Sequence, residues 1–319
     1  MTKFLGIEFA PLAIPLERRI QTFAVLQWTL SFLFLGFGSL FLVLYTLIFT
    51  KYWYLVLVYG IYYYYDRGTS ARGGRRVQWI RRWKIWEYMR DFFPAKLIKT
   101  ADLDPNKNYI MGFHPHGIMS TGAFLHFGTE ATGWSEKFPG IRPYLLVLAG
   151  HFQFPVYRDY FMTSGAAEVT SASMRYLLTQ NGTGNALGLV VGGALEALEA
   201  FPGRFNLKLK NKKDIFDQMD NPPGSLLRKL QDFLTKYLGF SPPVFHGRGV
   251  FNYTFGILPY RKPINTVVGK PIDVEKMSNP TQEDIDKLHQ KYLDCLKELF
   301  EEHKTQYGVD KDKHLCFID

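Results

Sequence analysis

Cysteine is scarce in this 319-residue chain: Cys295 and Cys316 are the only two, and both lie near the C-terminus. The scarcity argues against the disulfide framework that holds small secreted domains together, and we expect a reducing compartment. Several catalytic signatures are also absent, namely G-x-S-x-G, the Walker loop, H-E-x-x-H and C-x-x-C. Their absence excludes most nucleophilic serine and cysteine mechanisms and most zinc hydrolases.

Acidic residues are outnumbered, with 29 Asp and Glu against 38 Lys and Arg, which gives a formal net charge of +9. A basic chain of this kind needs an acidic partner, which can be nucleic acid, an anionic membrane face or a phosphate-bearing ligand. The sequence has no zinc-finger, helix-turn-helix or RNP pattern, so a nucleic-acid partner is not expected.

Charged residues are missing altogether from residues 20–50, and after Lys51 the apolar run resumes until residue 66. Because one membrane-spanning helix needs about 20 apolar residues, the stretch predicts a transmembrane helical hairpin over 20–66. We expect its break near Gly36–Tyr45. A hairpin that does not fully cross the bilayer and a single long buried helix are the alternatives.

Basic residues flank this stretch on both sides, at Arg18, Arg19, Arg67, Arg72, Arg75, Arg76, Arg81 and Arg82. By the positive-inside rule both flanks are cytosolic, which requires an even number of crossings. The charges therefore predict a multi-pass protein with a cytosolic N-terminus (1–19), a transmembrane hairpin (20–66) and a cytosolic domain (67–319).

After residue 78 the pattern becomes that of a globular α/β domain. Three apolar runs that end in phenylalanine or glycine predict strands, at 108–113, 144–150 and 186–193. Amphipathic helices are expected at 170–182, at 224–239 and from Thr281 onward, the last with a capping box and an inward stripe. Strands that alternate with helices favour a mainly parallel sheet with its sites at the strand ends.

The stretch "GFHPHGIMSTG", residues 112–122, places two histidines at the end of a predicted strand. A histidine can act as general base at neutral pH, and the glycine after it lets backbone N–H groups approach a ligand. An oxyanion site beside a base is what acyl transfer to an alcohol needs, so His114 and His116 are catalytic candidates. The alternatives are a polar turn with incidental histidines, or a metal site that would need His126 or Glu130.

A general base needs an orienting acid, and one candidate follows another predicted strand. "VVGGALEAL" ends that strand at Gly192 and Gly193 and places Glu196 in the first turn of a helix. In a parallel sheet this tip can lie beside the histidines, although an exposed carboxylate in a helix first turn is the alternative. Arg248 and a basic strip at 204–213 could face phosphates, although a solvated strand edge is the commoner explanation for the strip.

These motifs follow one another as in one known family. In chain order they are "FFP", "HPHG", "FPGI", "RDYFMTSG", "VGGALEAL" and "FHGRG". With "EFAPLAIPLERRIQTFAVLQW" and "GRGVFNYTFGILPYRKPINTVVGKPI", they make the chain resemble the diacylglycerol acyltransferase 2 family, in particular its monoacylglycerol acyltransferase branch. The resemblance covers nearly the whole chain, and an ordered set of motifs is more specific than any one of them.

The resemblance implies an α/β fold, in which a membrane-anchored, glycerolipid-acyltransferase-like domain follows the N-terminal hairpin. It implies an enzyme of the endoplasmic reticulum membrane that esterifies 2-monoacylglycerol with fatty acyl-CoA to give diacylglycerol. Acyl-CoA is then a co-substrate, and neither a metal nor another cofactor is expected. The expected partners are these substrates, the lipid bilayer and, as a further option, a second copy or a related acyltransferase.

Roles for the site residues follow from the same resemblance. His116 would deprotonate the acceptor hydroxyl, and His114 would shape the site or bind the oxyanion. Related glycerolipid acyltransferases pair the histidine with a nearby aspartate, which is missing here, so Glu196 becomes the expected orienting residue. Substrate contacts are expected at Pro115, Gly117, Gly192, Gly193 and Arg248.

The chain departs from the family at one place, after Lys213, where it continues directly into "DIFDQ". A helix and a strand of the core are therefore expected to be missing, with little or no transferase activity as the result. One alternative function is a non-catalytic membrane partner or lipid binder. Another is an enzyme that uses diacylglycerol or a fatty alcohol as the acceptor.

Overall fold

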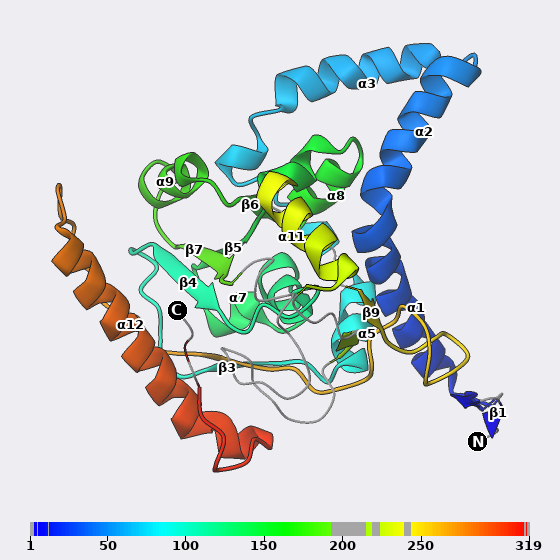
Figure 1. Cartoon of the computed structure of the whole chain (residues 1–319). Helices are drawn as coiled ribbons and strands as arrows, with labels where there is room; N and C mark the ends of the chain where they lie inside the picture. Colours follow the sequence, from blue (N-terminus) through cyan, green and yellow to red (C-terminus); the bar gives the residue numbers. More distant parts are fainter. Residues whose placement is uncertain are drawn as a thin grey trace.

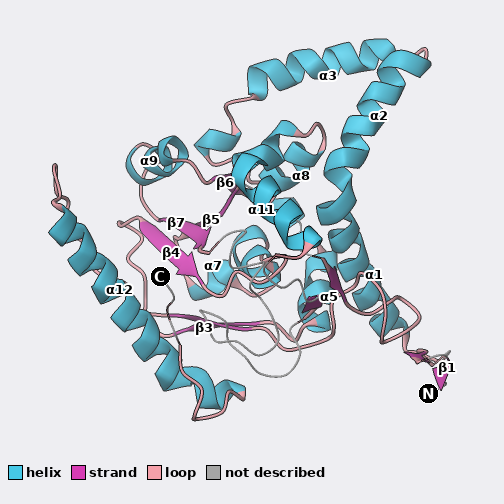
Figure 2. Ribbon diagram, in the orientation of Figure 1, coloured by secondary structure: helices cyan, strands magenta, loops and turns pink. Residues whose placement is uncertain are grey.

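The computed structural model describes residues 3–4, 6–11, 13–192, 215–218, 224–238, 244–315 and 317. Figures 1 and 2 show a small parallel sheet surrounded by helices, with a long N-terminal helix at one side. The predictions for Gly193, Glu196 and the strip at 204–213 concern residues outside this described part.

The elements up to the start of the sheet are β1 (Lys3–Phe4), β2 (Ile7–Glu8), α1 (Leu16–Leu30), η1 (Ser31–Leu35), α2 (Gly36–Phe49), α3 (Trp53–Asp66), η2 (Ser70–Arg72), α4 (Gln78–Arg81), α5 (Lys84–Phe92) and β3 (Lys96–Lys99). Those of the central region are β4 (Tyr109–Phe113), α6 (Thr121–Ala123), η3 (Phe124–Gly128), α7 (Trp134–Lys137), β5 (Arg142–Val147), η4 (Ala149–Gln153), α8 (Tyr157–Thr163), β6 (Ala166–Glu168), α9 (Ser171–Thr179) and β7 (Asn185–Val190). The C-terminal elements are β8 (Asp217–Gln218), α11 (Leu226–Leu238), β9 (Phe245–His246), β10 (Asn265–Val268), α12 (Gln282–His303) and η5 (Lys304–Tyr307).

Four strands form one parallel sheet in the order β4-β7-β5-β6. The three apolar runs expected to be strands are β4, β5 and β7, so that prediction is confirmed. Apolar runs of this kind suit a parallel sheet, because helices cover both of its faces. Phe113 at the end of β4 pairs with Val190 at the end of β7, so the two tips lie side by side.

The N-terminal apolar stretch differs from the expectation of a break at Gly36–Tyr45. α1 continues through the π-helical η1 into α2, and the chain turns only at residues 50–52, before α3. Gly36 serves packing rather than a turn, because a Cβ there would lie 3.3 Å from the ring of Phe154. Within the described residues, one helix, Leu16–Phe49, is long and apolar enough to cross a membrane.

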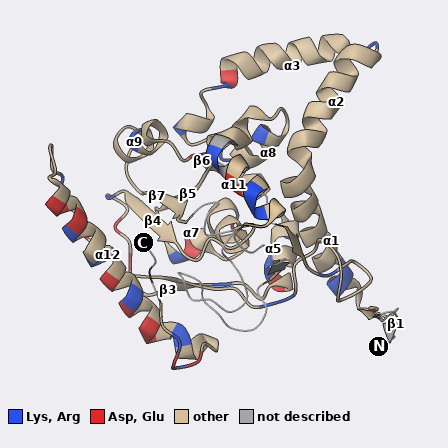
Figure 3. Cartoon of the chain, in the orientation of Figure 1, with Lys and Arg blue, Asp and Glu red and all other residues tan. Residues whose placement is uncertain are grey.

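α1 has different surroundings from α2 and α3, the two helices that follow it. α1 packs against α5 and buries Ala24, Val25 and Trp28 in the main hydrophobic core. α2 and α3 instead expose most of their large apolar side chains, and Figure 3 shows almost no charge along them. An exposed apolar surface of this extent marks contact with lipid or with another protein.

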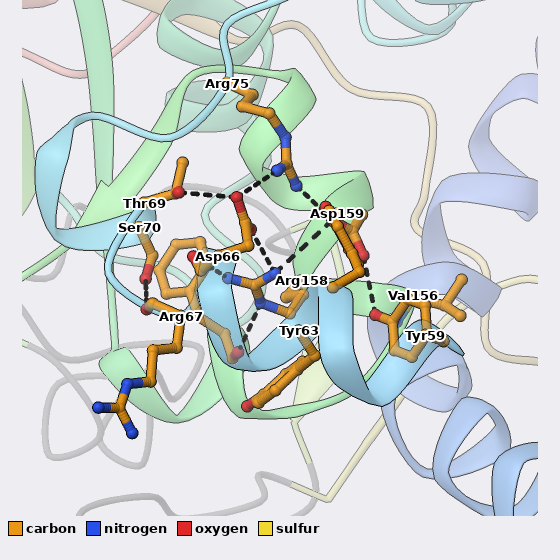
Figure 4. Close-up of polar contacts among 12 residues, drawn as sticks. Tyr59, Tyr63, Asp66, Arg67, Thr69, Ser70, Arg75, Val156, Arg158 and Asp159 are labelled. Atoms are coloured by element: carbon orange, nitrogen blue, oxygen red, sulfur yellow. Dashed lines mark hydrogen bonds and ion pairs between the residues drawn. The ribbon is translucent and has the colours of Figure 1, made fainter. Parts of the chain in front are cut away.

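A polar network joins the end of α3 to α8, as Figure 4 shows. The carboxylate of Asp66 accepts hydrogen bonds at 2.6 Å from both Arg158 and Arg75. The side chain of Arg158 is only 1% exposed, so this ion pair is largely buried. Asp159 accepts a further bond from the hydroxyl of Tyr59 at 2.9 Å, which anchors α3 a second time.

The helix starts expected at Thr170 and Thr281 are confirmed, whereas α9 ends at Thr179 and not at residue 182, and the inward faces are confirmed only in part. Thr170 caps α9, and Thr281 forms the expected capping box with Asp284 at the start of α12. Ile285 and Leu288 in the first half of α12 are exposed, whereas the second half of the expected stripe is half-buried. In α11 the apolar side chains of Leu226, Leu230 and Phe233, which were expected to face inward, are also exposed.

Candidate functional site

The two histidines occupy the turn that leaves β4, at the carboxyl edge of the parallel sheet. Ligand sites of open α/β sheets are found at this edge, where loops after neighbouring strands meet. The end of β7 lies beside the end of β4, as predicted, and Gly192 follows it with a φ of 93°. Pro115, which lies between His114 and His116, is half-buried like both of them.

The imidazole of His116 is held by the backbone of its own turn. Its Nδ1 lies 2.7 Å from the carbonyl oxygen of Gly117. A carbonyl oxygen only accepts hydrogen bonds, so Nδ1 carries the proton and Nε2 is the nitrogen that can take one. Burial lowers the pKa of His116, partly opposed by the bond to Gly117, so the ring is neutral at neutral pH. These are the properties of a general base.

The conformation of the turn requires glycine at position 117. Its φ is 61°, in the left-handed region that favours glycine, and a Cβ there would meet no atom within 4 Å. Space beside the backbone at this point allows a ligand to approach it closely. Ser120 closes the turn by donating a hydrogen bond from its hydroxyl to the carbonyl oxygen of His116 at 3.1 Å.

His114 has a partner that the sequence did not indicate. Its Nε2 lies 2.8 Å from the hydroxyl oxygen of Tyr292, which projects from α12. Burial lowers the pKa of His114, so this ring is also neutral at neutral pH. Gly112 makes the contact possible, because a Cβ at that position would lie 2.0 Å from the same hydroxyl. A glycine inside a strand is the signal that marks such a close approach.

Arg248 is not joined to the histidines by any described contact. It is 7% exposed and lies over the ring of Tyr253 at 4.6 Å. Burial lowers its pKa, and the nearby charge of Arg18 acts in the same direction. Arg248 also lies close enough to Arg261 to lower the pKa of that residue. Three arginines are thus grouped near the start of α1.

A hollow of about 470 Å³ opens beside two of these arginines. Its lining residues are Pro15, Glu17, Arg18, Gln21, Asp91, Phe92, Pro94, Arg261 and Pro263. Arg261 is held in place by donating to the side-chain oxygen of Gln21 at 2.6 Å and lies 4.1 Å from the ring of Phe92. A fixed guanidinium at the side of a hollow is suited to an anionic group.

No group of three or more His, Cys, Asp and Glu side chains that could hold a metal ion occurs in the part of the chain that the structure describes. His126, which the metal alternative would need, is fully buried, and its Nδ1 lies 3.0 Å from the hydroxyl of Thr132. Burial lowers its pKa to about 3. Glu130 is paired with Arg81 instead.

The sequence pattern of the diacylglycerol acyltransferases matches two segments, residues 45–214 and 212–318, which together make up most of the chain. The chain therefore belongs to the diacylglycerol acyltransferase family, a family of enzymes, as its ordered motifs predicted. No solved structure matches it significantly.

Curated relatives extend this similarity to both branches of the family. The chain is 46% identical to 2-acylglycerol O-acyltransferase 1 of Bos taurus over 98% of this chain and 100% of the relative. It is 45% identical to the human protein of the same name over 98% of this chain and 99% of the relative. It is 45% identical to diacylglycerol O-acyltransferase 2 of Mus musculus over 94% of this chain and 83% of that protein.

This coverage corrects the expectation that a core segment is missing after Lys213. The bovine and human relatives are matched over 99 to 100% of their own length, so the layout of the family runs from end to end. The two family segments meet at residues 212–214, within a stretch that the structure does not describe. The inactivity that was expected from a missing segment has no basis in these comparisons.

Proposed function

We propose that this protein transfers the acyl group of a fatty acyl-CoA to 2-monoacylglycerol, giving diacylglycerol and free CoA. The observation that carries the proposal is the neutral imidazole of His116, with Nδ1 bonded to Gly117 and Nε2 able to accept a proton. Similarity along nearly the whole chain to proteins named 2-acylglycerol O-acyltransferase supports the choice of acceptor.

The reaction begins when Nε2 of His116 takes the proton of the free hydroxyl of the monoacylglycerol. The oxygen attacks the carbonyl carbon of the thioester, and a tetrahedral intermediate with a negatively charged oxygen forms. As the intermediate collapses, the bond from carbon to sulfur breaks and the CoA sulfur takes the proton back from the imidazolium. The new ester leaves without a covalent acyl-enzyme. His114 and the backbone at Gly117 lie in the same turn, where they can stabilise the oxyanion.

The orientation of His116 has two proposed contributors. In the described residues its Nδ1 proton is accepted by the carbonyl of Gly117, which fixes the tautomer. Glu196 remains the proposed carboxylate orienter, since it follows the strand whose tip adjoins the histidines. Gly192 and Gly193 would leave room for the acyl chain or the thioester between the two tips.

Arg248 is proposed to bind the phosphates of acyl-CoA together with Arg18 and Arg261. This role is supported by the hollow beside Arg18 and Arg261 and by the grouping of the three guanidinium charges. An Arg261→Gln variant should raise the KM for acyl-CoA several-fold and leave the KM for monoacylglycerol unchanged. Equal KM values for acyl-CoA in the variant and the wild type would argue against the assignment.

The long apolar helix supports a membrane location, which we propose to be the endoplasmic reticulum. Both substrates are amphipathic or lipid-soluble, so an enzyme with an exposed apolar helix can receive them at the membrane surface. α2 and α3 would form the embedded hairpin, with its turn at residues 50–52. The remainder of the chain would lie on the cytosolic side.

A second candidate acceptor is diacylglycerol, because relatives named diacylglycerol O-acyltransferase 2 match at similar identity. The test is to supply labelled acyl-CoA to purified protein with monoacylglycerol, diacylglycerol or a fatty alcohol in parallel. We expect label in diacylglycerol at the highest rate. Label mainly in triacylglycerol or wax ester would replace the proposed acceptor, and label in none would favour a lipid-binding partner without activity.

A further inference from the structure

The contact between Tyr292 and His114 joins two parts of the chain that are 178 residues apart. α12 lies along the β4 side of the sheet (Figure 1). None of its side chains is fully buried. Tyr292 is half-buried, and its hydroxyl makes a bond of 2.8 Å to the ring of the site histidine. One polar contact thus connects the C-terminal helix to the proposed active site.

The absence of a side chain at Gly112 leaves room for this hydroxyl. A Cβ at that position would lie 2.0 Å from the Tyr292 hydroxyl oxygen and 3.0 Å from the ring carbon that bears it. Gly112 has no left-handed φ, so its backbone does not require glycine. In a strand interior glycine is otherwise unfavourable by roughly 0.5–1 kcal/mol relative to alanine. Room for Tyr292 is therefore the structural reason for a glycine at this place.

The surroundings of this bond favour one tautomer of His114. A buried phenol hydroxyl needs an acceptor, and Nε2 of His114 is the acceptor that the described residues provide. With Nε2 accepting, the proton of the neutral ring lies on Nδ1. This Nδ1 is buried and has no hydrogen-bond partner in the described residues. A buried N–H without a partner is a donor available to a ligand atom.

We propose that Tyr292 is a positioning residue for His114: its hydroxyl donates to Nε2 and thereby presents Nδ1–H to the oxyanion of the tetrahedral intermediate. The inference rests on the proposed acyl transfer and adds a group from the C-terminal helix to it. Because the oxyanion exists only during the reaction, the contact contributes to the transition state and not to substrate binding.

The test begins with Tyr292→Phe, which removes only the hydroxyl. We expect kcat to fall about 10-fold with an unchanged KM for both substrates, because one buried hydrogen bond is lost in the transition state. Tyr307→Phe, in η5 just beyond α12, is the matched control and should behave as wild type. Unchanged kcat in Tyr292→Phe, or a loss that appears mainly in KM, would overturn the inference.

Gly112→Ala provides a second variant that fills the slot and leaves both partner side chains in the sequence: its Cβ would lie 2.0 Å from the Tyr292 hydroxyl oxygen and 3.3 Å from Nε2 of His114. It should lower kcat by a similar factor, and the double variant should be about 10-fold impaired rather than 100-fold, since both changes remove the same contact. A kcat about 100-fold below wild type in the double variant would overturn the inference. If Tyr292→Phe does not fold, Gly112→Ala alone is the test. A fall of kcat of about 10-fold would then support the inference, and an unchanged kcat would overturn it. Wild-type protein inactive with every acceptor would instead refute the proposed function.

Discussion

At the residue scale, the two histidines of the β4 turn have different surroundings although they are separated by one proline. The Nδ1 of His116 is bound by a backbone carbonyl of its own turn, whereas His114 is bound through Nε2 by a side chain of α12. The two rings therefore use opposite nitrogens in these two bonds. One ring is suited to accepting a proton and the other to donating a hydrogen bond.

The pKa of His116 makes a prediction for the pH dependence of the reaction. Burial lowers it below the ordinary value of 6.5, so the base is already deprotonated at neutral pH. We expect kcat/KM to rise with pH through a midpoint below 6.5 and to be level from there to pH 8. The rates should be measured with saturating acyl-CoA in detergent. A midpoint above 6.5 would contradict the neutral, buried base.

The sequence predicted His114 and His116 because the motif lies at the end of an apolar run, where local pattern and chemistry coincide. It did not predict Tyr292, because a tyrosine on an amphipathic helix has the same local pattern whether it packs or binds a histidine. Gly112 was the available signal, but only the fold shows which distant side chain fills the space beside it.

At the scale of elements, the sheet was predicted better than the N-terminal helices. β4, β5 and β7 are apolar runs with clear ends, and a parallel sheet buries such runs on both faces. The helix break was expected near Gly36–Tyr45. In the structure Gly36 fits against Phe154, and the turn occurs beside Lys51, the one charged residue between residues 20 and 65.

The network between α3 and α8 gives a stability prediction. Asp66→Asn removes the carboxylate charge at 2.6 Å from the guanidinium of Arg158, whose side chain is 1% exposed. Breaking such a pair should lower the free energy of unfolding by about 3 kcal/mol. Asp102→Asn is the matched control, because Asp102 is 93% exposed beside Lys99 and its pair should contribute less than about 1 kcal/mol.

Thermal unfolding in detergent, followed by intrinsic fluorescence, would compare the two variants with the wild type. A large fall of the midpoint for Asp66→Asn and a small one for the control would agree with a buried anchor. Similar midpoints for both variants would show that the link between α3 and α8 contributes little to stability.

At the scale of the whole molecule, the packing of α1 adds to the charge argument for topology. In the proposed hairpin arrangement, residues 16–30 lie on the same side of the membrane as the globular part, because α1 packs against α5. Most of the exposed large apolar side chains of this region lie in α2 and α3, and the second half of α3 is anchored to α8 through Tyr59 and Asp66. A hairpin that leaves and returns on one side fits this arrangement.

We therefore predict that N-terminal and C-terminal tags are both digested by protease added to sealed microsomes. The basic residues on both sides of the apolar stretch favour the same cytosolic orientation. A lumenal marker protein should remain intact as the control for sealed vesicles. Protection of the N-terminal tag alone would require an odd number of crossings and would contradict the hairpin.

The measurement that tests the central claim most directly is acyl transfer by His116→Gln. Purified wild-type protein, His116→Gln and His289→Gln would receive labelled acyl-CoA and 2-monoacylglycerol at equal protein concentrations. Loss of the general base should lower diacylglycerol formation at least about 100-fold, while the exposed His289 on α12 should be replaceable without effect. Diacylglycerol formed by His116→Gln at the wild-type rate would contradict the account.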